Sequence, residues 1–81
     1  MTLTPTAIAA IDAAVADRTD ADVARFIDIH RHPELGFMEE RTAGIVADRL
    51  RELGYTVTTG IGGTGVTGVL RNGAGPTVMY R

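Results

Sequence analysis

Two histidines and a run of glycines are the residues of this 81-residue chain whose types and spacing could do chemistry. His30 and His32 form an H-x-H pair, which collects one metal ion on a strand, where residues two apart share a face. On a helix they point about 200° apart, and zinc needs three or four ligands. The chain has no other histidine and no cysteine. A metal site would need help from the nearby acids Glu34, Glu39 and Glu40. We favour the alternative, in which His30 packs in the core and His32 bonds to the backbone at the following turn.

Nucleophilic and acid/base chemistry find little support in these residues. The chain contains neither serine nor cysteine, which excludes a serine or thiolate nucleophile from this chain. Glu39 and Glu40 are adjacent, so on a helix their side chains diverge. They are better placed as first-turn charges near the positive end of a helix. We therefore assign no catalytic, cofactor-binding or metal-ligating residue in this chain.

The glycine run is the stretch TTGIGGTGVTG from Thr58 to Gly68. Gly60, Gly62 and Gly65 fit the G-x-G-x-x-G spacing of phosphate-binding loops. A dinucleotide site needs a helix after the glycines, but the residues that follow are β-branched and predict a strand. Kinase and P-loop sites need a lysine, and all eight basic residues are arginine. The run therefore predicts a tight hairpin rather than a nucleotide site.

Composition narrows the possible partners. The net charge is −2, and the arginines are scattered singly, which argues against nucleic acid. No stretch approaches the roughly 18 apolar residues of a membrane span, and the N-terminus lacks the features of a secretory signal. We expect a cytoplasmic protein with no membrane partner.

Helix signals fill the first part of the chain. Thr4 as N-cap and Pro5 at the first helical position predict a first helix. Thr19 or Asp20 could cap a second helix, which Pro33 would end. Its inner face would carry three apolar residues and a histidine: Val23, Phe26, Ile27 and His30.

A turn, a further helix and a strand-rich part follow. In the HPELG turn, Gly36 is free to take a positive φ. The next helix is expected from about Glu39 to Leu53, with Gly54 as its left-handed cap. Alternating residues then predict three short strands, at 55–58, 66–70 and 77–80. The fold class is therefore α/β, with two to three N-terminal helices followed by three short strands.

Several motifs in fixed order carry a family resemblance over residues 20–81: His30-x-His-Pro-Glu-Leu-Gly36, Glu39-Glu-x-Thr42, Leu50-x-x-Leu-Gly54, Gly60-Ile-Gly-Gly-Thr-Gly-Val66 and Gly68-Val-Leu70. This order resembles the N-terminal part of bacterial amidohydrolases that cleave N-acyl-amino acids. These are hydrolases of the hippurate and indole-acetyl-amino acid type, related to aminoacylase and the zinc carboxypeptidases.

The resemblance implies a larger mixed-sheet catalytic domain with an inserted dimerisation domain, acting as a homodimer or other homo-oligomer. It also implies two divalent metal ions, zinc or manganese, whose activated water cleaves a small-molecule N-acyl-amino acid. The family's metal ligands and catalytic glutamate lie downstream of the matched region. Residues 1–81 would then be an incomplete N-terminal part of the catalytic domain, without the inserted domain and the metal-ligand region. Alone it is expected to be inactive and to bind no metal.

A second interpretation comes from a different functional class. The chain could be a small stand-alone α/β module without catalytic activity, which binds a partner through the open edge of its sheet. The coding sequence beyond Arg81 would separate the two interpretations.

Overall fold

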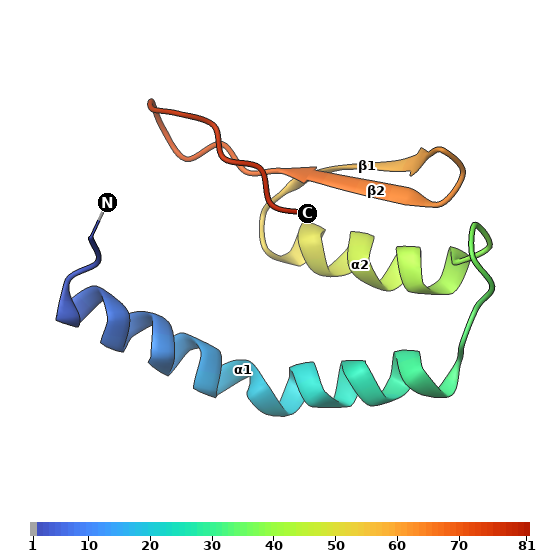
Figure 1. The fold of residues 1–81 in the computed structure, drawn as a ribbon, viewed down its shortest axis with the longest axis horizontal. Helices are drawn as coiled ribbons and strands as arrows, with labels where there is room; N and C mark the ends of the chain where they lie inside the picture. Colours follow the sequence, from blue (N-terminus) through green and yellow to red (C-terminus); the bar gives the residue numbers. More distant parts are fainter. Residues whose placement is uncertain (1) are drawn as a thin grey trace. The chain divides into compact units, whose positions relative to one another are not determined.

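The computed structural model describes residues 2–81. They divide after Pro33 into two compact units, each described here by itself. The first unit contains helix α1 (Pro5–Arg31), and the second contains helix α2 (Glu40–Glu52) and strands β1 (Thr56–Ile61) and β2 (Gly65–Val69) (Figure 1). The chain is thus an α/β structure, as predicted.

Helix α1 begins as the sequence indicates. Thr4 is the N-cap, and its hydroxyl accepts a hydrogen bond of 3.0 Å from the backbone N–H of Ala7. Pro5 occupies the first helical position, where the missing N–H costs nothing. At the other end His32 is the C-cap and Pro33 follows, so the predicted stop is confirmed.

The predicted break near Thr19 is wrong, because α1 is one continuous helix of 27 residues. The Thr19 hydroxyl donates to the carbonyl of Val15 at 2.9 Å, one turn back, instead of capping a new helix. An Asp22–Arg25 ion pair of 2.9 Å supports the same turn. Since the surrounding residues include several alanines and neither glycine nor proline, nothing interrupts helical geometry.

The inner face predicted for this segment is not buried. No residue of α1 is buried, and Phe26 is 69% exposed. His30 is exposed as well, so its expected place in a core is wrong. The reason is simple: α1 is the only element of its unit, and an apolar stripe needs a second element to cover it.

Helix α2 ends in the predicted glycine cap. Gly54 has φ +88°, and its N–H bonds to the carbonyl of Arg51 at 3.0 Å. The N–H of Tyr55 reaches back to the carbonyl of Leu50, also at 3.0 Å. This pair of bonds is the Schellman arrangement, which satisfies the last carbonyls and turns the chain toward β1.

Strands β1 and β2 form an antiparallel hairpin, with Thr56 opposite Val69 and Ile61 opposite Gly65. A bulge interrupts the register between Thr58 and Ile61. The first two predicted strands are therefore confirmed, but the third is wrong. Residues 77–80 form no strand, and Val78, Met79 and Tyr80 are almost fully exposed. Alternating residues become a strand only beside a partner that completes the hydrogen-bond ladder, and here the segment has none.

Helix α2 packs on the hairpin, and the hydrophobic core in this contact is very small. Among residues 2–81, Ala47 of α2 is the only buried apolar side chain, at 1% exposure. No helix in the described part of the chain combines the length and apolar character of a membrane span.

Candidate functional site

The polar side-chain contacts that join different segments of the second unit lie where three segments meet: the HPELG turn, the first turn of α2 and the hairpin tip at residues 60–65. We call residues 35–39 the loop. Four side chains make these contacts: Glu34, Glu39, Thr42 and Thr64. They belong to three of the motifs that carry the family resemblance, and they make two separate contacts, Glu34 with Thr42 and Glu39 with Thr64.

Glu34 caps helix α2 from outside the helix. Its carboxylate accepts bonds from the N–H of Arg41 at 2.8 Å and from the N–H of Thr42 at 2.7 Å. The Thr42 hydroxyl donates a third bond of 2.7 Å. Glu39 occupies the N-cap position but makes no capping bond with its side chain. Glu34 therefore satisfies N–H groups that the helix cannot satisfy itself, and it places a negative charge at the positive end.

These bonds hold the pKa of the half-buried Glu34 carboxyl below its ordinary value of 4.5. The largest cause is the Thr42 hydroxyl, followed by the N–H groups of Arg41 and Thr42, while partial desolvation opposes them. The positive charge of Arg41 adds a smaller lowering. All of the hydrogen bonds favour the charged carboxylate, because protonation removes acceptor capacity.

A pH dependence follows from this lowered pKa. The stabilisation of the folded protein by the charged Glu34 carboxylate is fully present above the unfolded-state pKa near 4.5. It is lost as the pH falls through the lower folded-state pKa of this carboxyl. We expect acidification from pH about 6 to about 3 to destabilise the wild-type protein more than the Glu34→Gln variant. Denaturant unfolding at the two pH values measures the difference. Glu52→Gln, at an exposed glutamate, is the matched control. Equal acid sensitivity in wild type and Glu34→Gln would contradict the assignment.

Glu39 ties the loop to the hairpin. The Thr64 hydroxyl donates a bond of 3.1 Å to its carboxylate, across 25 positions of sequence. Beside this bond lies a hollow of about 330 Å³, lined on the loop side by Gly36 and Phe37 and on the hairpin side by Ile61 and Gly62.

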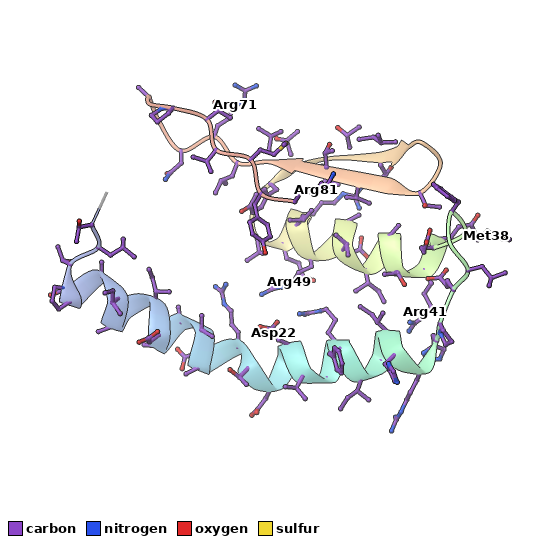
Figure 2. The ribbon with its side chains drawn as sticks, viewed as in Figure 1. Asp22, Met38, Arg41, Arg49, Arg71 and Arg81 are labelled. Atoms are coloured by element: carbon purple, nitrogen blue, oxygen red, sulfur yellow. The ribbon has the colours of Figure 1, made fainter. Side chains whose placement is uncertain are left out.

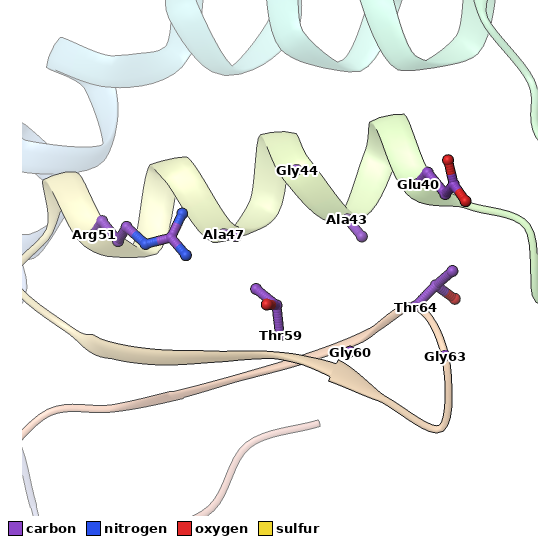
Figure 3. A pocket seen from close by; sticks show the side chains of 9 residues that line it. All are labelled: Glu40, Ala43, Gly44, Ala47, Arg51, Thr59, Gly60, Gly63 and Thr64. Atoms are coloured by element: carbon purple, nitrogen blue, oxygen red, sulfur yellow. The ribbon is translucent and has the colours of Figure 1, made fainter.

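A second hollow, of about 340 Å³, lies between α2 and the hairpin (Figure 3). Small residues, Ala43, Gly44 and Ala47, line it on the helix side, and Glu40 and Arg51 stand near its two ends.

The histidines do not form a site with each other. The ring of His30 stacks on Phe26, with centroids 6.1 Å apart. His32 Nδ1 lies 2.9 Å from the carbonyl oxygen of Asp28. His32 therefore does bond to the backbone, but its partner lies in α1 and not around the following turn as predicted. Within residues 2–81, no three His, Asp or Glu side chains converge as a metal ion would require.

The glycine run is a hairpin turn, as predicted. Gly60, Gly62 and Gly63 have φ of +73°, +61° and +108°, a region that residues with a Cβ rarely adopt. Strand β2 follows directly, so no helix N-terminus is present there to hold a phosphate. At the HPELG turn, Gly36 does not take the positive φ that was predicted; the next residue, Phe37, has φ +65° instead.

Sequence reasoning missed the capping role of Glu34, because the residue lies six positions before the helix begins. A usable signal was present. The position before α2 holds glutamate, a poorer cap than Ser, Thr, Asp or Asn, so the first N–H groups needed an acceptor from elsewhere.

Known proteins resemble this chain over part of their length. It is 58% identical to a hippurate hydrolase of Campylobacter jejuni over 45 residues, which are 56% of this chain and 12% of that protein. It is 33% identical to the putative amidohydrolase YhaA of Bacillus subtilis over 79 residues, 91% of this chain and 20% of that protein. A thermostable carboxypeptidase of Saccharolobus solfataricus is 46% identical over 55 residues, 65% of this chain and 14% of that protein.

A match of 39 residues carries a different name, a putative glutamate–cysteine ligase of Rhodococcus jostii, and covers 5% of that protein. No protein-family profile and no solved structure matches the chain. The chain spans about a fifth or less of the length of these relatives.

The matches to hydrolases agree with the α/β architecture and with the order of the motifs. They support the class of protein that the motifs indicate, a fragment of an amidohydrolase or peptidase-family protein. Among the relatives named above, the highest identity is with the hippurate hydrolase.

Proposed function

We propose that this chain is the N-terminal part of the catalytic domain of an enzyme that hydrolyses the amide bond of N-acyl-amino acids. The observation that carries the proposal is the 58% identity to a hippurate hydrolase, whose matched segment contains 45 residues. Hippurate is an N-acyl-amino acid. The match to a putative amidohydrolase over 91% of the chain supports the same reaction class.

The proposed enzyme uses two divalent metal ions, zinc or manganese, which supply an activated water. Since no three ligand side chains converge within residues 2–81, we place the metal ligands and the proton-transferring glutamate in the rest of the protein. This segment then contributes a scaffold: the capped helix α2, the hairpin, and the loop between them. We further propose a cytoplasmic homodimer or other homo-oligomer, with no nucleic-acid or membrane partner.

The decisive experiment starts from the complete reading frame that contains this segment. The purified protein is assayed for release of free amino acid from N-benzoylglycine and from N-acetylated amino acids. We expect hydrolysis that falls at least about a hundredfold on chelation and returns with added zinc or manganese. The isolated segment, assayed beside it, should be inactive and bind no stoichiometric metal. A full-length protein that cleaves none of these amides, or cleaves them equally well after chelation, would overturn the proposal.

One observation supports the alternative of a stand-alone interaction module. In the described residues the sheet has only two strands, so the outer edge of each strand is unpaired. The minimal core around Ala47 weighs against it, since an independent domain needs more buried surface. A cooperative unfolding transition of the isolated segment, together with a stop codon after Arg81, would favour the module.

A further inference from the structure

The loop at residues 35–39 is held by polar bonds rather than by packing. The apolar side chains of Leu35, Phe37 and Met38 are 75%, 88% and 63% exposed. The Met38 side chain extends away from the ribbon (Figure 2). Because these side chains bury little surface, hydrophobic contacts cannot fix the conformation of the loop. The bonds at its two ends must do so.

The loop is tightly wound and strained. The N–H of Met38 bonds to the carbonyl of Leu35 at 2.9 Å, and the N–H of Glu40 bonds to the carbonyl of Met38 at the same distance. Between them Phe37 has φ +65°, a conformation that costs free energy for a bulky residue and persists only when its surroundings impose it. A strained loop without packing will relax if its end contacts are released.

The two ends are held with unequal strength. On one side the Glu34 carboxylate accepts three bonds of 2.7–2.8 Å from Arg41 and Thr42. On the other side, the Glu39 carboxylate accepts a single bond of 3.1 Å from the Thr64 hydroxyl, and the Glu39 carbonyl accepts a backbone bond of 3.0 Å from the N–H of Ala43 in α2. Short bonds to a charged group are individually strong, and three of them act together at Glu34. We therefore expect the Glu39–Thr64 bond to break before the bonds between Glu34 and α2.

We propose that the loop, residues 35–39, lies as a strap over the hollow beside the hairpin tip. The bonds of Glu34 to α2 are its anchor, and the Glu39–Thr64 bond to the hairpin is its latch. Gly36, Phe37 and Glu39 line the hollow from the strap. The hairpin lines it with Ile61, Gly62, Thr64 and Gly65. Breaking the latch lets Phe37 leave its left-handed conformation and widens the hollow, while the anchor keeps α2 capped. This inference concerns the conformation of the loop and does not depend on the proposed hydrolase activity.

Hydrogen exchange of backbone amides in the full-length protein tests the anchor and the latch separately. Thr64→Val removes the latch hydroxyl and keeps the shape of the side chain. We expect exchange in residues 35–39 and 60–65 to become at least about tenfold faster, with residues 41–44 unchanged. Glu34→Gln should accelerate exchange at residues 41–42 as well as in the loop. Thr67→Val, at an exposed threonine of β2, is the matched control and should change neither region.

Each other outcome would overturn part of the proposal. If Thr64→Val exchanges like Thr67→Val, the latch does not exist. If Glu34→Gln leaves residues 41–42 protected, Glu34 is no anchor. If either variant accelerates exchange throughout the protein, the contact supports the whole fold and not a local strap.

Discussion

Replacing Gly65 by alanine is expected to break the hairpin. Gly65 faces Ile61 at the bulge, and a Cβ at this position would overlap the carbonyl oxygen of Ile61 and lie 3.3 Å from its carbonyl carbon. The overlapped atom belongs to the backbone, so no side-chain rotation can relieve the clash. The two strands would have to separate at their tightest point. We expect a loss of about 3 kcal/mol in the free energy of unfolding.

Gly44→Ala is the matched control, because it makes the same chemical change where space is free. A Cβ at Gly44 would meet no atom within 4 Å, and the residue lies inside helix α2. Alanine is the better helix former, so this variant should gain about 0.5–1 kcal/mol. Denaturant unfolding of the full-length protein measures both changes. Gly65→Ala with wild-type stability would show that the strands part at the bulge without cost, contrary to the structure.

The features that sequence reasoning predicted correctly are those that neighbouring residues determine. Thr4 followed by Pro5 starts a helix because one hydroxyl and one missing N–H act within a single turn. Gly54 ends α2 because a left-handed residue is needed at that point. The glycines of the hairpin follow the same logic, since a tight turn needs positive φ.

The failures involve contacts with distant residues or their absence. Thr19 has a capping side chain, but its hydroxyl bonds within a helix that no residue interrupts. Residues 77–80 have a strand pattern but no partner strand. The roles of Glu34 and Glu39 were hidden because their partners, Thr42 and Thr64, lie 8 and 25 positions away. These same residues belong to the motifs that mark the family, so at least part of that pattern has a structural cause.

The second large effect is expected at Ala47, the one buried apolar side chain of the described chain. Ala47→Asp places a carboxylate in the contact between α2 and the hairpin, beside the hollow that Ala47 helps to line (Figure 3). Arg51, one turn along, could compensate such a charge, but it is already paired with Asp48 at 3.2 Å. The new carboxylate is therefore desolvated without a ready partner. We expect a loss of about 3 kcal/mol or more.

Ala13→Asp is the control that separates the effect of burial on the free energy of unfolding from the effect of helix propensity. Ala13 lies in the middle of α1 and is exposed, so aspartate there costs only the difference in helix propensity, roughly 0.7 kcal/mol. The excess loss in Ala47→Asp, measured by denaturant unfolding of the full-length protein, is the contribution of the α2–hairpin contact. Equal losses in the two variants would mean that α2 does not pack on the hairpin through this face. Both the capped helix and the strap depend on that contact, because Glu34 binds α2 and Glu39 binds the hairpin.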